Sequence, residues 1–278
     1  MGIEIECIID NSLFGIGVGE YHGGLDFGFG SWEAQRDGSL YYDEGNSEER
    51  KFKERTCVEF VSSKVRGKEG FVKLIEGFIA FFSKKGKYEL KEVISFNKSC
   101  GSHAHFSIAK RGLMRHKLHK TTYYKIYDKT RNLFYEKMRK SKIASKEQII
   151  SHYYREYSRK NGKLGNFDRW KDERNSEFNI LSDMRGQGIE WRGLNMLNIG
   201  TWKEFKEFWK IVYECLEKCV EMGLKYEEQE GTNFSKKEGE ELLKKVNEKV
   251  NLSIKTIKPE KETATIKTKF EEREECII

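Results

Sequence analysis

Three short segments of the sequence pair reactive side chains two residues apart, and in a β-strand that spacing puts both on one face. The pairs are Glu4 with Glu6, His103 with His105, and Glu190 with Arg192, and the residue between the members of each pair is apolar. Such alternation is typical of an antiparallel sheet with one polar face and one face packed on a core. The sequence therefore predicts an α+β fold, with a mostly antiparallel sheet and helices on its outer face.

The other predicted elements follow from the spacing of apolar residues. Strands are predicted at 3–9, 32–35, 56–62, 104–108 and 189–194. Helices are predicted at 71–83 and 202–222. The glycine-rich stretch 11–31 is expected to form a flexible loop or a hairpin, and it is a candidate lid.

Composition limits the class of protein. The chain has 278 residues, of which 37% are hydrophobic, enough for a sizeable core. Its formal net charge of +7 favours anionic partners. None of the six cysteines forms a CxxC pair, which favours reduced thiols in a reducing compartment. No apolar run has the length of a membrane span, and the first residues lack the pattern of a secretory leader. These features predict a cytoplasmic protein that does not enter a membrane.

The segment 110–174 differs from the rest of the chain in charge. It holds 20 Lys and Arg against 7 Asp and Glu, interleaved with tyrosines. It is predicted to be a mostly helical insertion in a domain that spans 1–228, and residues 229–278 are predicted to form a charged helix followed by a flexible tail. Two interpretations of the basic segment stay open: a solvated helical face, or a surface for nucleic acid or another acidic polymer.

Carboxylates in apolar strands are the first candidates for a metal site. Glu4 and Glu6 share a strand face, and Glu59 stands alone among apolar neighbours. Burying such groups without a partner would be costly. A divalent cation that prefers oxygen ligands, such as Mg²⁺ or Mn²⁺, would neutralise them. The alternative is that these strand faces are exposed to water.

Two histidines and a further carboxylate extend the candidate set. His103 and His105 follow Gly101, and on one strand face they can ligate a metal or contact phosphate. Glu190 and Arg192 would place a metal ligand beside a phosphate clamp, or they would form an ordinary surface ion pair. A structural zinc site is disfavoured, because no second pair of residues has the spacing of zinc ligands.

The order of these motifs resembles the glutamine synthetase and glutamate–cysteine ligase superfamily of carboxylate–amine ligases. Along the chain the motifs are GIEIE, the turn DGS, VEFVSS, CGSHAHFS and EWR. They look most like the amidoligase family, which is found often in phages and in small bacterial gene clusters. The resemblance spans about residues 2–210 and is weak through 110–174. It implies a curved sheet that carries the active site on its concave face.

The resemblance also implies a role for each matching residue. Ligands of the catalytic divalent metals would be Glu4, Glu6, Glu59, His103 and Glu190. His105 would lie beside phosphate or substrate, and Arg192 would contact the transferred phosphate. The cofactor-binding residues would be His103, Arg192 and Gly101. Asp37 and Ser39 match a turn near the substrate pocket.

The activity implied by the resemblance is ATP-dependent amide-bond formation through an acyl phosphate, with Mg²⁺ or Mn²⁺. The substrates would carry a carboxylate and an amine, as amino acids, peptides and cell-wall peptides do. Two positions depart from the family: Ser63 stands where proline is common, and Lys98 stands where glutamine synthetases carry a glycine-rich loop. The second departure leaves glutamate specificity open. The alternatives are a nucleic-acid-binding protein that uses 110–174 and an inactive ligase fold that only binds.

Overall fold

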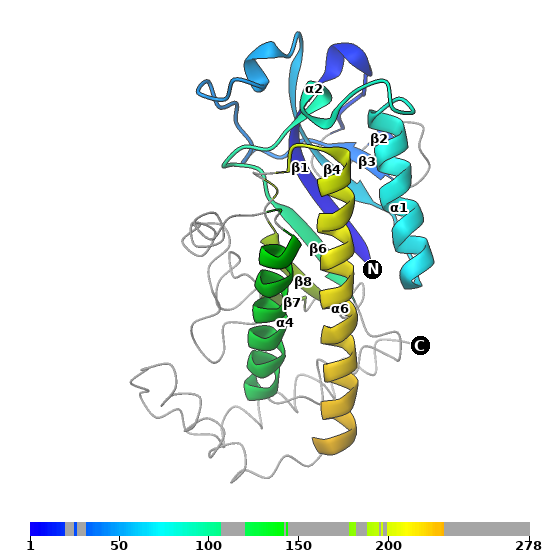
Figure 1. The fold of residues 1–278 in the computed structure, drawn as a ribbon, viewed down its shortest axis with the longest axis vertical. Helices are drawn as coiled ribbons and strands as arrows, with labels where there is room; N and C mark the ends of the chain where they lie inside the picture. Colours follow the sequence, from blue (N-terminus) through cyan, green and yellow to red (C-terminus); the bar gives the residue numbers. More distant parts are fainter. Residues whose placement is uncertain are drawn as a thin grey trace, which may run out of the picture. The chain divides into compact units, whose positions relative to one another are not determined.

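The first strand of the chain lies at the centre of an antiparallel sheet (Figure 1). The computed structural model describes residues 1–19, 25–26, 32–106, 120–141, 143, 178–181, 188–194, 196 and 199–230. Across these residues the sheet order is β2-β3-β4-β1-β6-β8-β7, and β5 also pairs with β1. The strand pairs in the described part of the chain are all antiparallel. The α+β class and the antiparallel sheet are therefore confirmed.

Each strand and helix predicted within the described residues has a counterpart in the structure, and β2, β5, β7 and α2 are additional elements that were not predicted. The strands are β1 (Gly2–Asp10), β2 (Leu25–Asp26), β3 (Trp32–Gln35), β4 (Arg55–Ser62), β5 (Ile94–Ser95), β6 (Ser102–Phe106), β7 (Phe178–Leu181) and β8 (Gly188–Leu194). The helices are α1 (Gly67–Phe82), α2 (Leu90–Val93), α4 (Lys120–Ser141) and α6 (Trp202–Glu230), with 3₁₀ turns η1 (Asn11–Leu13) and η2 (Glu49–Lys51). The described part of the basic segment is thus mainly α4, which confirms a helix there. Much of the glycine-rich stretch, and with it the candidate lid, lies outside the described residues.

Three helices cover one face of the sheet. Phe78 of α1 lies with its ring 5.5 Å from Phe60 of β4, and Phe134 of α4 lies 5.0 Å from Trp191 of β8. Phe205 of α6 stacks on Phe78 at 5.4 Å. The register puts Ile5 opposite Phe60, and Ala104 opposite both Ile3 and Trp191, so these residues share one face. The residues that alternate with them, including Glu4, Glu59 and Glu190, therefore project from the other face.

Helix α6 begins with a capping box and ties the other helices together. Glu204 accepts the N–H groups of Gly200 and Thr201, and the Thr201 hydroxyl accepts the N–H of Glu204. Lys137 of α4 bonds to Glu214 of α6 at 2.6 Å, and the two helices lie side by side (Figure 1).

The end of α6 differs from the prediction. The helix continues beyond Met222 to Glu230, where Gly231 is the sequence signal for its end. The elements described up to Gln229 form one compact unit, Met1–Gln229. Of the predicted tail 229–278, the first two residues are the last of α6, and the remainder lies outside the described residues. In the described residues no helix is both long and apolar enough to cross a bilayer.

The end of α1 contains two non-glycine residues in the left-handed region. Lys84 has φ of 45° and Lys85 has φ of 61°. The N–H groups of Lys84 and Lys85 bond to the carbonyls of Phe81 and Ala80, which closes the last turn as a Schellman motif. Lys84 also donates from Nζ to the carbonyl of Leu13. The side chain of Lys84 thus anchors the turn after β1, whereas Lys85 is exposed.

We expect Lys85→Gly to raise the free energy of unfolding by about 0.5–1 kcal/mol, because glycine adopts a positive φ without the steric cost that lysine carries. Lys87→Gly is the matched control, since Lys87 is not among the positive-φ residues, and it should lower stability by about 0.5 kcal/mol. Urea denaturation of both variants measures the difference. Equal changes in the two variants would contradict the assignment of strain to Lys85.

Candidate metal centre

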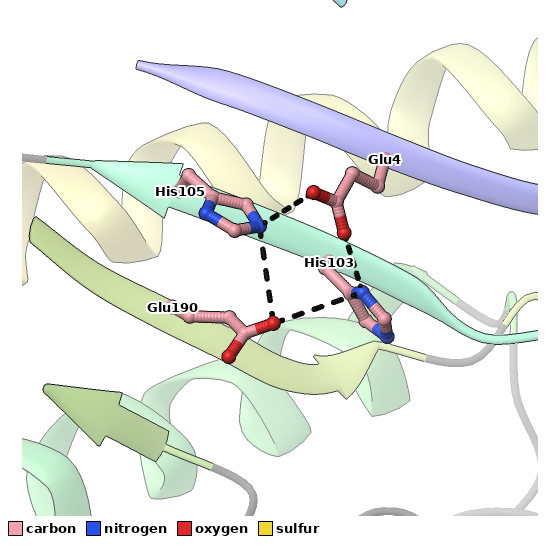
Figure 2. A group of neighbouring side chains, drawn as sticks. All are labelled: Glu4, His103, His105 and Glu190. Atoms are coloured by element: carbon pink, nitrogen blue, oxygen red, sulfur yellow. Dashed lines mark hydrogen bonds and ion pairs between the residues drawn. The ribbon is translucent and has the colours of Figure 1, made fainter. Parts of the chain in front are cut away.

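The register of three neighbouring strands brings most of the predicted site residues together. Glu4 of β1 lies opposite His103 of β6, and His105 lies opposite Glu190 of β8. Figure 2 shows these four side chains pointing toward one another from β1, β6 and β8. The face that carries them is opposite to the one covered by α1, α4 and α6.

A β-bulge in β8 changes the direction in which side chains project after the Glu190–Arg192 motif. Between Ala104 and Ser102 the register shifts, so that Arg192 and Gly193 both lie opposite His103. Bulges of this kind re-aim side chains at functional sites. Here Arg192 remains on the polar face, where its Nη1 donates to Glu190 Oε1 at 2.8 Å. The bulge allows Leu194, further along β8, to be buried.

The donor atoms of the four residues lie close together. His103 Nδ1 is 2.7 Å from Glu4 Oε2, and His105 Nε2 is 3.0 Å from Glu4 Oε1. Glu190 Oε1 is 3.9 Å from each of these two nitrogens. All four donors lie within 4.8 Å of one another.

These separations fit a shared cation. Two donors about 2.1 Å from one ion are about 3 Å apart when adjacent and about 4 Å apart when opposite. The distances between the histidine and carboxylate donor atoms in the structure run from 2.7 to 3.9 Å, which is close to this range. Glu190 is 1% exposed and His103 is 4% exposed, whereas Glu4 and His105 are half-buried, so one side of the donor set is open to solvent. The residues present therefore fit a divalent metal.

A second group of potential ligands shares His103 with the first. Glu6 lies opposite Glu59 on the neighbouring strand, and His103 Nε2 is 3.5 Å from Glu6 Oε1. Glu6, Glu59 and His103 also have donor atoms within 4.8 Å of one another. The residues predicted as metal ligands thus fall into two adjoining groups, and His103 is the residue common to both.

Burial and like charge dominate the electrostatics of this face. Burial together with the charges of Glu4 and Glu6 raises the pKa of Glu59 to about 9, against the opposing hydrogen bond from Gln35. Burial would also raise the pKa of Glu4, but His105 and His103 outweigh it and hold that pKa well below its usual range. Glu59 is therefore protonated at neutral pH unless a cation lies beside it.

Gly101 has a structural role that its sequence context only partly indicates. Its N–H donates to Glu6 Oε2 at 2.5 Å, and its carbonyl accepts the N–H of Glu6. A Cβ atom at this position would lie 2.9 Å from Glu6 Oε2 and 3.3 Å from His103 Nε2. The predicted role of Gly101 in cofactor binding is not tested by these contacts, which show that it orients a carboxylate.

A buried polar network, which the sequence analysis missed, shapes the approach to His103. Asn97 accepts the N–H and hydroxyl of Ser99 and donates to Tyr41 O and to Glu49. Glu49 is fully buried and also accepts the N–H of Asp43. This network fixes the turn that ends at Gly101. A glutamate outside any regular strand or long helix gives no periodic signal, so its burial could not be read from the sequence.

Three further residues lie at the margin of the site. Gln35, which the sequence analysis did not predict, donates to Glu59 Oε2 at 2.7 Å. The other two, Asp37 and Ser39, were predicted. Asp37 contributes to the raised pKa of Glu59, so its charge acts at the site, although it belongs to neither donor group. Ser39 is exposed and donates its N–H to Asp37, which forms the predicted turn. No cysteine in the described part of the chain joins either donor group.

Comparison with known proteins gives no relative for this chain. No protein-family model matches it, and neither a curated protein nor a solved structure is significantly similar to it. The resemblance to the amidoligase family therefore stays a prediction from the motifs.

We expect Gly101→Ala to weaken the centre, because the added methyl group would push Glu6 and His103 from their positions. The free energy of unfolding should fall by about 1–3 kcal/mol, and affinity for divalent cations should fall with it. Gly38→Ala is the control, since a Cβ there meets nothing within 4 Å. Calorimetric titration and urea denaturation measure both effects, and a wild-type response in Gly101→Ala would contradict the packing argument.

The raised pKa of Glu59 predicts a pH-dependent stability in chelator-treated protein. A carboxyl whose folded pKa is raised loses stability as pH rises from its unfolded pKa through the folded one. Glu59→Gln removes that loss, so its advantage over wild type should be absent near pH 4 and grow to about 2–3 kcal/mol by pH 7. Glu33→Gln, at an exposed position on β3, is the control. A difference independent of pH would refute the assignment.

Proposed function

We propose that the protein is an ATP-dependent carboxylate–amine ligase whose chemistry takes place on the polar face of the sheet. The observation that carries this proposal is the buried donor set of Glu4, His103, His105 and Glu190 with Arg192 beside it. On this proposal the sheet is curved, the site lies on its concave face, and the fold resembles the catalytic domain of glutamine synthetase. The order of the motifs along the chain supports the same class.

Arg192 has the properties required of a phosphate clamp. Glu190 holds it through Nη1, while Nε is buried and has no hydrogen-bond partner within the described residues. Burial would lower its pKa, but Glu190, Glu6 and Glu4 raise it, so the guanidinium stays charged. A planar guanidinium with further N–H donors can bind the oxygens of a transferred phosphoryl group.

The proposed reaction has two steps. A substrate carboxylate attacks the γ-phosphorus of ATP and displaces ADP, which gives an acyl phosphate. An amine then attacks the acyl carbon, loses a proton and displaces phosphate, which leaves an amide. A divalent metal bound by this donor set would neutralise charge on the phosphoryl oxygens. Arg192 would bind the same oxygens, and Glu190 would orient Arg192.

The substrates are proposed by chemical class only. They are a carboxylate and an amine of the kind found in amino acids, peptides and cell-wall peptides. The turn of Asp37 and Ser39 is the proposed edge of their pocket. An inactive ligase fold is the weaker alternative, because a chain that had lost catalysis would have no reason to keep so many buried charges together.

A nucleic-acid-binding function through the basic segment is the other alternative. In its described part, Lys137 and Lys140 are paired with glutamates, and Lys125 and Lys129 lie over the ring of Tyr226. These contacts occupy several of its cations within the protein itself. Salt-dependent binding to RNA or DNA remains the measurement that would favour this alternative.

We expect ATP turnover to depend on one carboxylate–amine pair from a panel of amino acids and peptides. Glu190→Gln and Arg192→Lys should each lower kcat by about 10²–10⁴-fold. Glu190→Gln removes the carboxylate that would bind the metal and orient Arg192, and Arg192→Lys removes the forked donor that would bind the transferred phosphoryl group. Arg50→Lys, the same substitution at an exposed position, should behave as wild type. ADP release measures turnover, and mass spectrometry identifies the amide.

Nucleotide binding is the second test of the ligase proposal. Calorimetry with Mg²⁺ present should detect nucleotide binding to the wild-type protein. No nucleotide binding, or turnover that is unchanged in both variants, would remove the proposal and leave the nucleic-acid alternative.

A further inference from the structure

The two donor groups at the centre compete for one imidazole. His103 faces Glu4 and Glu190 with Nδ1, and it faces Glu6 with Nε2. A neutral imidazole has a single lone pair on one nitrogen and a hydrogen on the other. It can therefore serve as a metal ligand toward only one of the two groups.

The distances favour the group on the Nδ1 side. His103 Nδ1 is 2.7 Å from Glu4 Oε2, whereas Nε2 is 3.5 Å from Glu6 Oε1. His105 adds a second imidazole to the Nδ1 side, with Nε2 3.0 Å from the other oxygen of Glu4. Among the described residues, the Nε2 side offers the carboxyls of Glu6 and Glu59 as potential ligands.

Glu6 is placed to orient His103 instead. A histidine that binds a metal usually directs its other ring N–H at a carboxylate or carbonyl, which fixes the ring. Glu6 stands at Nε2, is 5% exposed, and is itself fixed by the N–H of Gly101 at 2.5 Å. Glu59 is held in the same way by Gln35 at 2.7 Å. Both carboxyls are thus anchored by protein donors.

We propose that the protein holds a single resident transition-metal ion through Glu4, His103, His105 and Glu190, and that Glu6 is a positioning residue for His103 rather than a resident ligand. This assignment differs from the role beside phosphate or substrate predicted for His105. It deepens the proposed function, because the same site is concerned, but it requires no ligase activity. The Glu6 and Glu59 pair gains a cation only together with nucleotide phosphates.

The donor types specify the class of metal. Two imidazoles with two carboxylates suit divalent first-row ions such as Mn²⁺, Fe²⁺, Co²⁺ and Zn²⁺. Mg²⁺ prefers an all-oxygen shell, which a donor set with two imidazoles does not provide. The resident ion is therefore a transition metal, and Mg²⁺ is the ion that accompanies ATP.

Titration of the full chain with Mn²⁺ in the absence of nucleotide tests this assignment. Electron paramagnetic resonance should show one Mn²⁺ bound per chain, and displacement should require an excess of Mg²⁺ of about 100-fold or more. Pulsed measurements should detect nitrogen couplings from two imidazoles. These readouts use the wild-type protein, so they do not depend on the folding of any variant.

Three substitutions separate ligands from positioning residues. His105→Gln should remove one nitrogen coupling and weaken Mn²⁺ binding by 100-fold or more, whereas Glu6→Gln should keep both couplings and weaken binding by about tenfold. Glu33→Gln, at an exposed position on β3, which two strands separate from β6, should match wild type. Circular dichroism confirms that each variant is folded before titration.

Several results would overturn the assignment. These are two Mn²⁺ ions per chain without nucleotide, an unchanged nitrogen signal in His105→Gln, or equal affinity for Mg²⁺ and Mn²⁺. Its failure is distinct from failure of the proposed function. Tight Mn²⁺ binding without ATP turnover removes the ligase and leaves the metal centre, whereas turnover with Mg²⁺ alone and weak Mn²⁺ binding removes only the inference.

Discussion

Repulsion between buried carboxylates is the constraint around which this structure is arranged. Glu6 and Glu59 lie directly opposite each other on adjacent strands, where like charges are destabilising. Each is held by a protein donor, Gly101 N–H in one case and Gln35 in the other. Glu4 is held by two imidazoles, and Glu190 by Arg192. Three features place these partners beside the carboxylates. They are the turn before His103, the bulge in β8 and the absence of a side chain at Gly101.

Packing on the apolar face of these strands determines which side chains lie on the polar face. Because side chains alternate, a slip of one residue in register would move every carboxylate into the core. The ring contacts of Phe60 and Phe78, and of Trp191 and Phe134, fix the register of β4 and β8 against the helices. Precise packing on one side of the sheet therefore sets the distances between donors on the other. Substitutions in the core are expected to disturb the candidate metal centre without contacting it.

The sequence predicted what is periodic and missed what depends on contacts between distant segments. Pairs of reactive residues at a spacing of two, such as His103 and His105, identified both the strands and the polar face. The meeting of β1, β6 and β8 could not be derived from spacing, since strand order is a property of the whole sheet. The roles of Glu49 and Gln35 were not predicted, because neither residue belongs to a motif. The short distance between His105 and Glu4 could not be predicted without the register of β1 and β6. Most candidate site residues came from residue type and spacing, and the resemblance implied their individual roles. The structure groups most of these residues without testing the activity.

A purely structural explanation of this cluster is physically weak. Buried charged groups seldom stabilise a fold more than apolar residues of the same size would, because the cost of removing them from water offsets their attraction. Burial and the charges of Glu4 and Glu6 raise the pKa of Glu59 to about 9, so ionising all three carboxyls together carries an electrostatic cost. A bound cation would relieve that cost and would stabilise the folded state in proportion to its affinity and concentration. The mutual repulsion of these carboxylates would therefore favour tight binding of a cation. This links the stability of the sheet to the chemistry proposed for it.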